Sequence, residues 1–184
     1  MNLIFRALRE NEIDVRVQSV TEKGCILLLY KDARCDMNIL DETVGSPNWQ
    51  RSHELVNGNL FCNIGIRFDR ESGFGEWVWK QDVGTESNTE KEKGQASDSF
   101  KRACFNWGIG RELYTSPFIW VNAKDCNMYS IKGQNNKTIW KCNDKFTVEK
   151  IAYDENKNIT GLSIVNKTNS KRVFVMKPAK AGDK

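Results

Sequence analysis

The sequence has no run of apolar residues that approaches the about 18 needed for a membrane-spanning helix. Its opening residues, MNLIFRALR, are too few and too charged for a secretory signal peptide. Six cysteines, most of them in apolar runs, are typical of a protein from a reducing compartment. We therefore expect a cytoplasmic protein without a membrane segment.

Clustered metal ligands are also missing from the sequence. A structural zinc site uses four nitrogen or sulfur ligands, commonly as Cys-x-x-Cys pairs. No two cysteines have that spacing, and the only histidine is His53. In an apolar run such as residues 24–29, a thiol acts as a small hydrophobic side chain. We expect neither a metal nor another cofactor.

Motifs for covalent chemistry are absent as well. No Gly-x-x-x-x-Gly-Lys-Ser/Thr loop occurs, and Gly108-Ile109-Gly110 follows a predicted helix, whereas a dinucleotide fingerprint follows a strand. A Ser-His-Asp triad would have to use His53, whose predicted strand has no diagnostic neighbours. The sequence therefore predicts a protein that is not an enzyme.

The composition is that of a globular protein, with 39% hydrophobic and 28% charged residues among 184. The net charge of +4 permits a nucleic-acid partner without requiring one. Hydrophobic periodicity predicts an α+β core in the order β-β-α-β-β-β-α. Its expected elements are a short opening helix over 3–8, strands over 13–20 and 25–30, a helix over 33–44, strands over 48–56, 60–69 and 76–83, a long helix ending at Gly108, and a closing strand over 117–121.

The expected domain organisation has four parts. Residues 1–123 form the core, 124–143 a polar linker, 144–177 a small β-meander appendage, and 178–184 a disordered tail. Asn57-Gly58 predicts a tight hairpin within the core, and overlapping capping boxes in 87–92 predict the start of the long helix.

The long helix carries two cations that its core does not use. Its apolar stripe contains Ala96, Phe100, Ala103, Cys104 and Trp107. At about 100° per residue, Lys101 falls about 120° from the centre of the stripe and Arg102 nearly opposite it. Two cations on a rigid element can hold a phosphate backbone without reading its bases. The alternative is an ordinary solvated face on which Arg102 pairs with Asp98.

Several segments resemble the signature of the Rad-fifty-two-type single-strand annealing proteins. These are Asp82-Val83-Gly84, then Ser97-Asp98-Ser99-Phe100-Lys101-Arg102-Ala103 with Trp107-Gly108, and upstream residues 37–45 with Trp49. The resemblance extends from about residue 12 to residue 114. It implies the family's fold, in which a curved antiparallel sheet lies on a long helix.

The resemblance also implies a function and a set of site residues. Family members bind and anneal single-stranded DNA without ATP in recombination and repair, as rings or filaments of about ten or more subunits. Lys101 and Arg102 match the lysine–arginine pair of the family's DNA groove, and Arg16 matches another groove arginine. A bacterial or phage-encoded protein is implied, with a single-strand-binding protein or an exonuclease as candidate partners.

The chain departs from the family pattern at the outer of two DNA sites. Asn59 replaces a lysine of that site, and Phe105 stands where some relatives have an arginine. Lys91 and Lys93 are candidate substitutes, although they can equally be exposed charges at the start of a helix.

Two other functions remain open at the level of sequence. One is a metal-dependent nuclease that uses Asp82, Glu86 or Asp98. The other is a passive protector that binds single strands and slows their pairing. The six tryptophans suggest stacking on bases, but packing in a core or a subunit interface is favoured for them.

Overall fold

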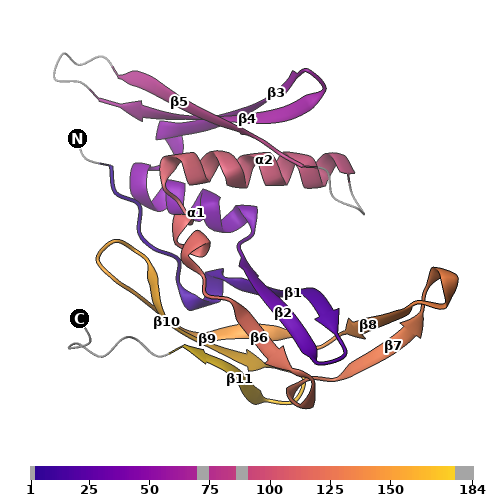
Figure 1. Ribbon diagram of the computed structural model, residues 1–184. Helices are drawn as coiled ribbons and strands as arrows, with labels where there is room; N and C mark the ends of the chain where they lie inside the picture. Colours follow the sequence, from indigo (N-terminus) through magenta and orange to yellow (C-terminus); the bar gives the residue numbers. More distant parts are fainter. Residues whose placement is uncertain (1–2, 70–74, 86–90, 177–184) are drawn as a thin grey trace. The chain divides into compact units, whose positions relative to one another are not determined.

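The computed structural model describes residues 3–69, 75–85 and 91–176. It is a mixed α+β protein with mostly antiparallel strands and two α-helices, as expected for the fold class. The chain divides into two compact units (Figure 1). Unit 1 contains Met1–Ala7 and Asp32–Arg111, and unit 2 contains Leu8–Lys31 and Glu112–Lys184.

Unit 1 consists of a three-stranded antiparallel sheet and two helices. Its elements are α1 (Ala33–Val44), β3 (Trp49–Val56), β4 (Asn59–Phe68), β5 (Glu76–Val83) and α2 (Lys91–Trp107). The strand order is β3-β4-β5, and α2 packs against β4 and β5. The elements follow the expected order, and their bounds differ from the expected bounds by no more than a residue or two.

Local sequence signals explain why these elements begin and end where they do. The Asp32 carboxylate accepts hydrogen bonds from the backbone N–H groups of Arg34 and Cys35, which caps α1. Asn57 and Gly58 both have positive φ, 52° and 77°, as the predicted two-residue hairpin between β3 and β4 requires.

The core of unit 1 lies between β4 and α2. Cys62, Ile64 and Ile66 alternate along β4 and are buried, as are Phe100 and Ala103 on α2. This is the period-2 pattern of one sheet face meeting the 3.6-residue stripe of a helix. The predicted stripe on the long helix is therefore the surface that packs against the sheet.

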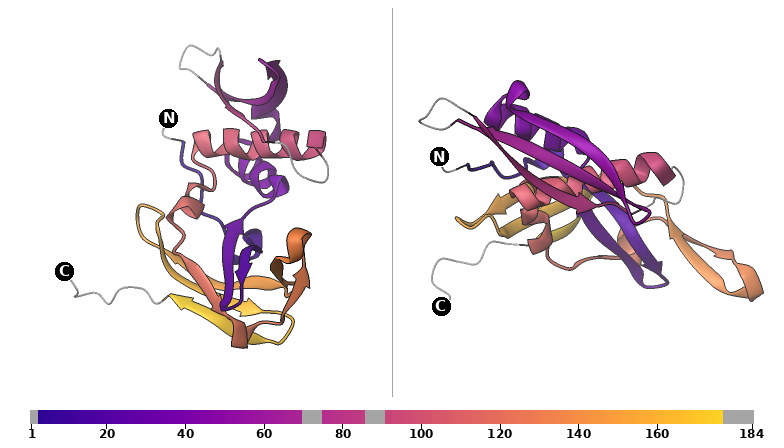
Figure 2. Two further views of the ribbon diagram at one scale, coloured as in Figure 1. Left: turned by 45° about the vertical axis from the view of Figure 1, so that its right-hand side comes forward. Right: turned by 90° about the horizontal axis from the view of Figure 1, so that it is seen from above.

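Unit 2 is built on a curved, nearly barrel-shaped sheet with the order β11-β10-β9-β1-β2-β6 (Figure 2). Its strands are β1 (Asp14–Thr21), β2 (Gly24–Tyr30), β6 (Ile119–Asn122), β9 (Phe146–Tyr153), β10 (Ile159–Asn166) and β11 (Lys171–Met176). A separate hairpin consists of β7 (Met128–Lys132) and β8 (Thr138–Cys142). Short 3-10 turns occur at Glu10–Glu12, Ser46–Asn48, Arg111–Thr115, Ala123–Asp125 and Gln134–Asn136.

The predicted helix over residues 3–8 is wrong, because this segment has no regular secondary structure. Phe5 and Leu8 are buried, and the backbone N–H of Leu8 donates to the buried Glu112 carboxylate at 2.7 Å. The chain also passes from unit 1 to unit 2 within this segment. Tertiary partners have overridden a weak helical pattern, as they commonly do for short segments.

The expected linker over 124–143 contains the β7–β8 hairpin. Its strands are largely exposed and short, at five residues each. The expected appendage over 144–177 shares its sheet with β1, since Asp14 pairs with Thr147 and Val15 with Phe146. The first strands and the last strands of the chain therefore belong to one unit.

Two expectations concern residues outside the described ranges, namely the start of the capping boxes at 87–90 and the tail at 178–184. Among the helices that the structure describes, none has both the length and the apolar character needed to cross a membrane.

Gly84, in the predicted Asp-Val-Gly strand end, allows a close approach of β5 to α2. A Cβ atom at this position would lie 2.2 Å from the carbonyl oxygen of Gln95 and 2.6 Å from the backbone nitrogen of Ser99. Both of these are helix backbone atoms that cannot move alone. We expect Gly84→Ala to lower the free energy of unfolding by about 1–3 kcal/mol, measured by urea denaturation.

The exposed Gln81 on the same strand provides the control. Gln81→Ala should change the free energy of unfolding by less than about 0.5 kcal/mol. Equal stability of Gly84→Ala and the unsubstituted protein would show that the strand end does not depend on this contact.

Candidate nucleic-acid interface

Lys101 and Arg102 lie on α2 and are half-buried, next in sequence to the buried Phe100 and Ala103. The two cations are adjacent in sequence and therefore about 100° apart around the helix axis. Arg102 turns toward β5, where its Nε lies 3.4 Å from Oδ1 of Asp82. The arginine side chain is 42% exposed, so this pair is of the solvated kind that contributes at most about 1 kcal/mol.

Asp98 has a different role from the ion pair considered for it. Its Oδ2 accepts hydrogen bonds from the backbone N–H and the hydroxyl of Thr85, at 3.0 and 3.1 Å. Asp98 thereby fastens the segment after β5 to the helix. Arg102, for which pairing with Asp98 was the alternative expected from the sequence, instead lies next to Asp82 of β5.

Two further cations converge at the end of α2. Lys80 Nζ and an Arg111 NH group both donate to the carbonyl oxygen of Asn106, at 2.9 and 3.0 Å. Lys80 Nζ also lies 4.5 Å from the centre of the Trp107 ring. These contacts complement the negative end of the helix dipole, which by itself explains why cations are stable here.

Lys80, Arg102 and Arg111 form one surface feature, which we term the β5–α2 basic patch. Arg102 and Asn106 are one helical turn apart on the same side of α2. Lys80 and Asp82, two residues apart, share one face of β5. The three cations therefore lie along the side of α2 next to β5, with Asp82 beside Arg102. Lys80 and Arg111 were not among the residues predicted from the sequence.

The other predicted cations lie elsewhere. Lys91 and Lys93 are exposed on the first turn of α2, at the opposite end from Lys80. Arg16 belongs to unit 2, where it is exposed on β1 with its guanidinium 5.8 Å from the centre of the Tyr30 ring. Asn59, at the position of the family's outer-site lysine, is exposed at the start of β4.

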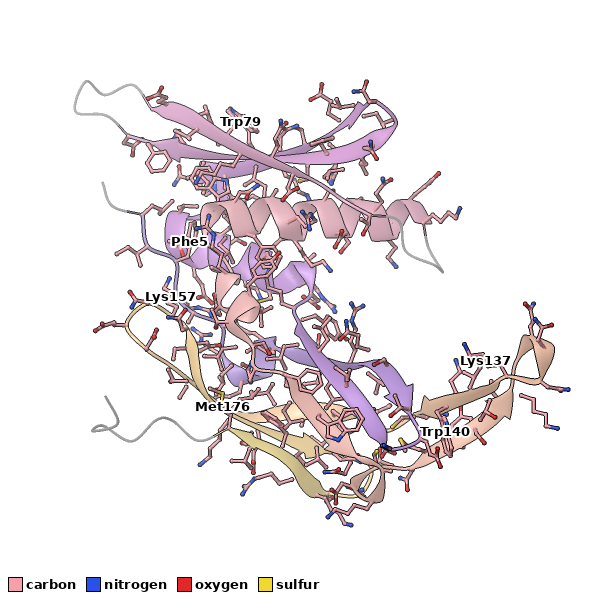
Figure 3. The ribbon with its side chains drawn as sticks, in the orientation of Figure 1. Phe5, Trp79, Lys137, Trp140, Lys157 and Met176 are labelled. Carbon is pink, nitrogen blue, oxygen red and sulfur yellow. The ribbon has the colours of Figure 1, made fainter. Side chains whose placement is uncertain are left out.

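The tryptophans of unit 1 divide into packed and exposed residues. Trp49 Nε1 donates to Asp41 at 2.6 Å, and Trp107 Nε1 donates to the carbonyl of Ile64 at 3.1 Å, so both are held within the unit. Trp79 is 46% exposed and lies on the sheet face turned away from α2 (Figure 3). The Trp77 ring is 6.0 Å from it, centre to centre. Packing is confirmed for the first pair, while Trp79 presents an accessible aromatic surface.

The carboxylates proposed for a nuclease do not gather around a common point among the described residues. Asp82 is paired with Arg102 and Asp98 with Thr85, and Glu86 lies outside the described ranges. His53 contacts the carbonyl of Ala96 through Nε2 at 3.2 Å, which is a packing role.

Cysteines do gather, contrary to the sequence expectation of scattered apolar thiols. In the part of the chain that the structure describes, the one group able to hold a metal ion is Cys25, Cys126 and Cys142, whose Sγ atoms lie within 4.8 Å of one another. They come from β2, from the residue after a 3-10 turn, and from β8. Spacing rules could not reveal a cluster assembled from three distant segments.

Burial favours the uncharged thiol at Cys25 and Cys126. Burial, together with the neighbouring Cys142 thiol, raises the pKa of Cys126 to about 11. Burial likewise raises the pKa of Cys25, with Cys126 and Cys142 acting in the same direction.

No family model, no curated protein and no solved structure matches this chain. The arrangement of its own residues therefore carries the functional argument.

Unit 2 has a hollow of about 380 Å³ over β9, β10 and β11, beside a strong ion pair. Arg172 donates to both carboxylate oxygens of Glu149, each at 2.6 Å, and Ser163 donates to the same carboxylate at 2.9 Å. These hydrogen bonds lower the pKa of Glu149 from 4.5 to about 2. Arg172 and Glu149 neutralise each other, so this hollow is a weak candidate for an anion site.

The Glu149 pair generates a pH-dependent prediction. Because the folded-state pKa is lowered, its stabilisation is complete above the ordinary value of 4.5 and is lost as the pH falls toward about 2. We expect Glu149→Gln to reduce the acid-induced loss of stability across this window, measured by denaturation at several pH values. Arg172→Gln should move the pKa of Glu149 upward in a carboxyl NMR titration; an unchanged pKa would contradict the assigned cause.

Proposed function

We propose that this protein binds single-stranded DNA without ATP and anneals complementary strands, as an oligomer of the Rad-fifty-two type. The observation that carries the proposal is the β5–α2 basic patch, whose Arg102 is adjacent in sequence to Lys101 on α2. Three of its features support a phosphate-binding role: it is rigid, it is solvent-accessible, and it contains more cations than carboxylates.

In this proposal, the phosphates of one strand bind along α2. Arg102 exchanges its solvated contact with Asp82 for a phosphate oxygen, a substitution that costs little at an exposed pair. Lys101 and Lys80 add positive charge on either side. Neutralised phosphates repel a second strand less, so complementary bases can meet. No bond is made or broken, and no cofactor takes part.

Exposed apolar side chains of unit 1 support assembly into oligomers. Trp79 is 46% exposed on the face of the β3-β4-β5 sheet turned away from α2, beside Trp77, whereas Leu55 and Val78, 71% and 39% exposed, lie on the other face at different ends of the sheet. Exposed apolar side chains such as these are candidate sites of protein contact or ligand binding. In the proposed ring or filament, neighbouring subunits cover part of this sheet, and Trp79 is a candidate for stacking on a base.

One prediction concerns the Lys101–Arg102 pair on α2. Lys101→Ala with Arg102→Ala should abolish annealing of complementary oligonucleotides, followed by fluorescence energy transfer, because the groove loses its central charges. Secondary structure and oligomer size should be unchanged, since neither side chain belongs to the buried core.

The matched control removes two exposed lysines from unit 2. Lys145→Ala with Lys167→Ala changes the net charge equally and should retain annealing. Unchanged annealing by the α2 double variant would overturn the proposal. In magnesium, strands of shortened length would indicate a nuclease, and pairing slower than in buffer alone would indicate a passive protector.

Another prediction concerns Lys80 and Arg111. Lys80→Gln with Arg111→Gln should lower the slope of log affinity against log salt by about 1.4, since each phosphate contact on a single strand contributes about 0.7. The slope is measured by fluorescence anisotropy of labelled single-stranded DNA over a range of salt concentrations. A slope identical to that of the unsubstituted protein would exclude the β5–α2 basic patch from the interface.

A further inference from the structure

Cys25, Cys126 and Cys142 meet within unit 2, whereas Lys101 and Arg102 belong to unit 1. Cys25 and Cys126 are buried, and Cys142 is half-buried. Three thiols within 4.8 Å of one another are close to the spacing of metal-bound thiolates, since tetrahedral zinc–sulfur bonds of about 2.3 Å place sulfur atoms about 3.8 Å apart. Shifts of side-chain rotamers would close the remaining difference.

The segments that carry Cys126 and Cys142 are joined by a buried polar network. The Asp144 carboxylate accepts hydrogen bonds from the backbone and side-chain N–H groups of Asn127, at 2.8 and 3.0 Å, and from Asn166 at 2.6 Å. Asn166 and Asn169 also donate to the carbonyl of Asp125. The residue after Cys126 is thereby tied to the residue two positions after Cys142.

The position of Cys25 is equally constrained. It pairs with Val121 of β6, while the carbonyl of Lys23, in the turn between β1 and β2, accepts a hydrogen bond from Ala123. At the preceding Gly24, a Cβ atom would lie 2.1 Å from the carbonyl oxygen of Val121, so β2 and β6 approach closely here. The three sulfur atoms are thus presented by backbone that is fixed before any ligand arrives, which favours a binding site over incidental packing.

The chemistry of the donors selects the class of ligand. Three sulfur donors without oxygen or nitrogen exclude Mg²⁺ and Ca²⁺, which take oxygen ligands, and favour thiophilic cations such as Zn²⁺. A divalent ion is preferred over a monovalent one because three thiolates carry three negative charges in a buried setting beside Asp144. Zinc with three protein ligands keeps a fourth position for water or another exchangeable ligand. Of the three sulfur donors, Cys142 is the one that is only half-buried.

We propose that Cys25, Cys126 and Cys142 form a trithiolate site that binds one thiophilic d¹⁰ divalent cation, with Zn²⁺ as the expected ion. Each thiol releases one proton when its sulfur binds the ion, and the three thiolates with the cation carry a net charge of −1. No electron is transferred. The site joins β2 and the segment after β6 to β8, so the bound ion would fasten the β7–β8 hairpin to the main sheet of unit 2.

The test uses the full-length protein, fully reduced and freed of metal with a chelator. Cadmium, a spectroscopic substitute for zinc, should produce thiolate-to-metal charge-transfer absorption in the ultraviolet that saturates at one equivalent. Addition of either zinc or cadmium to the metal-free protein should release up to three protons per ion, measured with a pH indicator in weak buffer, and excess zinc should reduce the cadmium band by competition. Cys142→Ala, which removes the half-buried thiol, should weaken binding by at least about 100-fold.

Cys35→Ala is the matched control, because Cys35 is a buried thiol of unit 1 outside the cluster. It should bind cadmium as the unsubstituted protein does, and circular dichroism should confirm that both variants are folded. The proposal is overturned if the reduced protein gives no charge-transfer band, if Cys142→Ala retains it, or if Cys35→Ala loses it equally. Mapping of a disulfide between two of the three cysteines, in protein that takes up no metal after reduction, would assign the cluster to thiol oxidation. Annealing assays are independent of all these outcomes.

Discussion

The pairing of β2 with β6 is the constraint on which the rest of the structure depends. Leu27 lies opposite Ile119 and Gly24 opposite Asn122, although nearly all of unit 1 separates these partners in the chain. Unit 1 is therefore an insertion between two hydrogen-bonded neighbours. The chain leaves unit 2 after β2 and returns to it before β6, and two of the clustered cysteines, Cys25 and Cys126, lie on or near this pair of strands.

Within each unit, the sequence predicted correctly those features that depend only on residues close together in the chain. The bounds of α1 and the turn at Asn57-Gly58 were predictable, because capping by Asp32 and positive φ at two residues are local requirements. The stripe around Phe100 was predictable for the same reason. The irregular conformation of the segment before Leu8 was not, since this segment is held by partners such as Glu112 that are distant in sequence.

The features that could not be predicted from the sequence depend on contacts between residues far apart in the chain. Nothing in the pattern of residues 144–177 indicates that their strands continue the sheet of β1. The cysteine cluster could not be detected in the sequence, because Cys25, Cys126 and Cys142 are far apart in the chain and only the folded structure brings them together. On α2, periodicity identified Lys101 and Arg102 as free of the core, but it could not show that Asp82 draws Arg102 toward β5, where Lys80 and Arg111 extend the positive surface.

The insertion of unit 1 has a consequence for how the chain folds. Contacts within unit 1 are mostly between neighbours in sequence, as in the β3-β4-β5 meander, and such contacts form rapidly. The sheet of unit 2 must instead join segments from both ends of the chain, at an entropic cost that grows with the length of the loop to be closed. Once unit 1 is folded, its two ends are anchored on a compact body and the effective loop is short. A folded insertion would thus shorten the loop that must close before β2 pairs with β6.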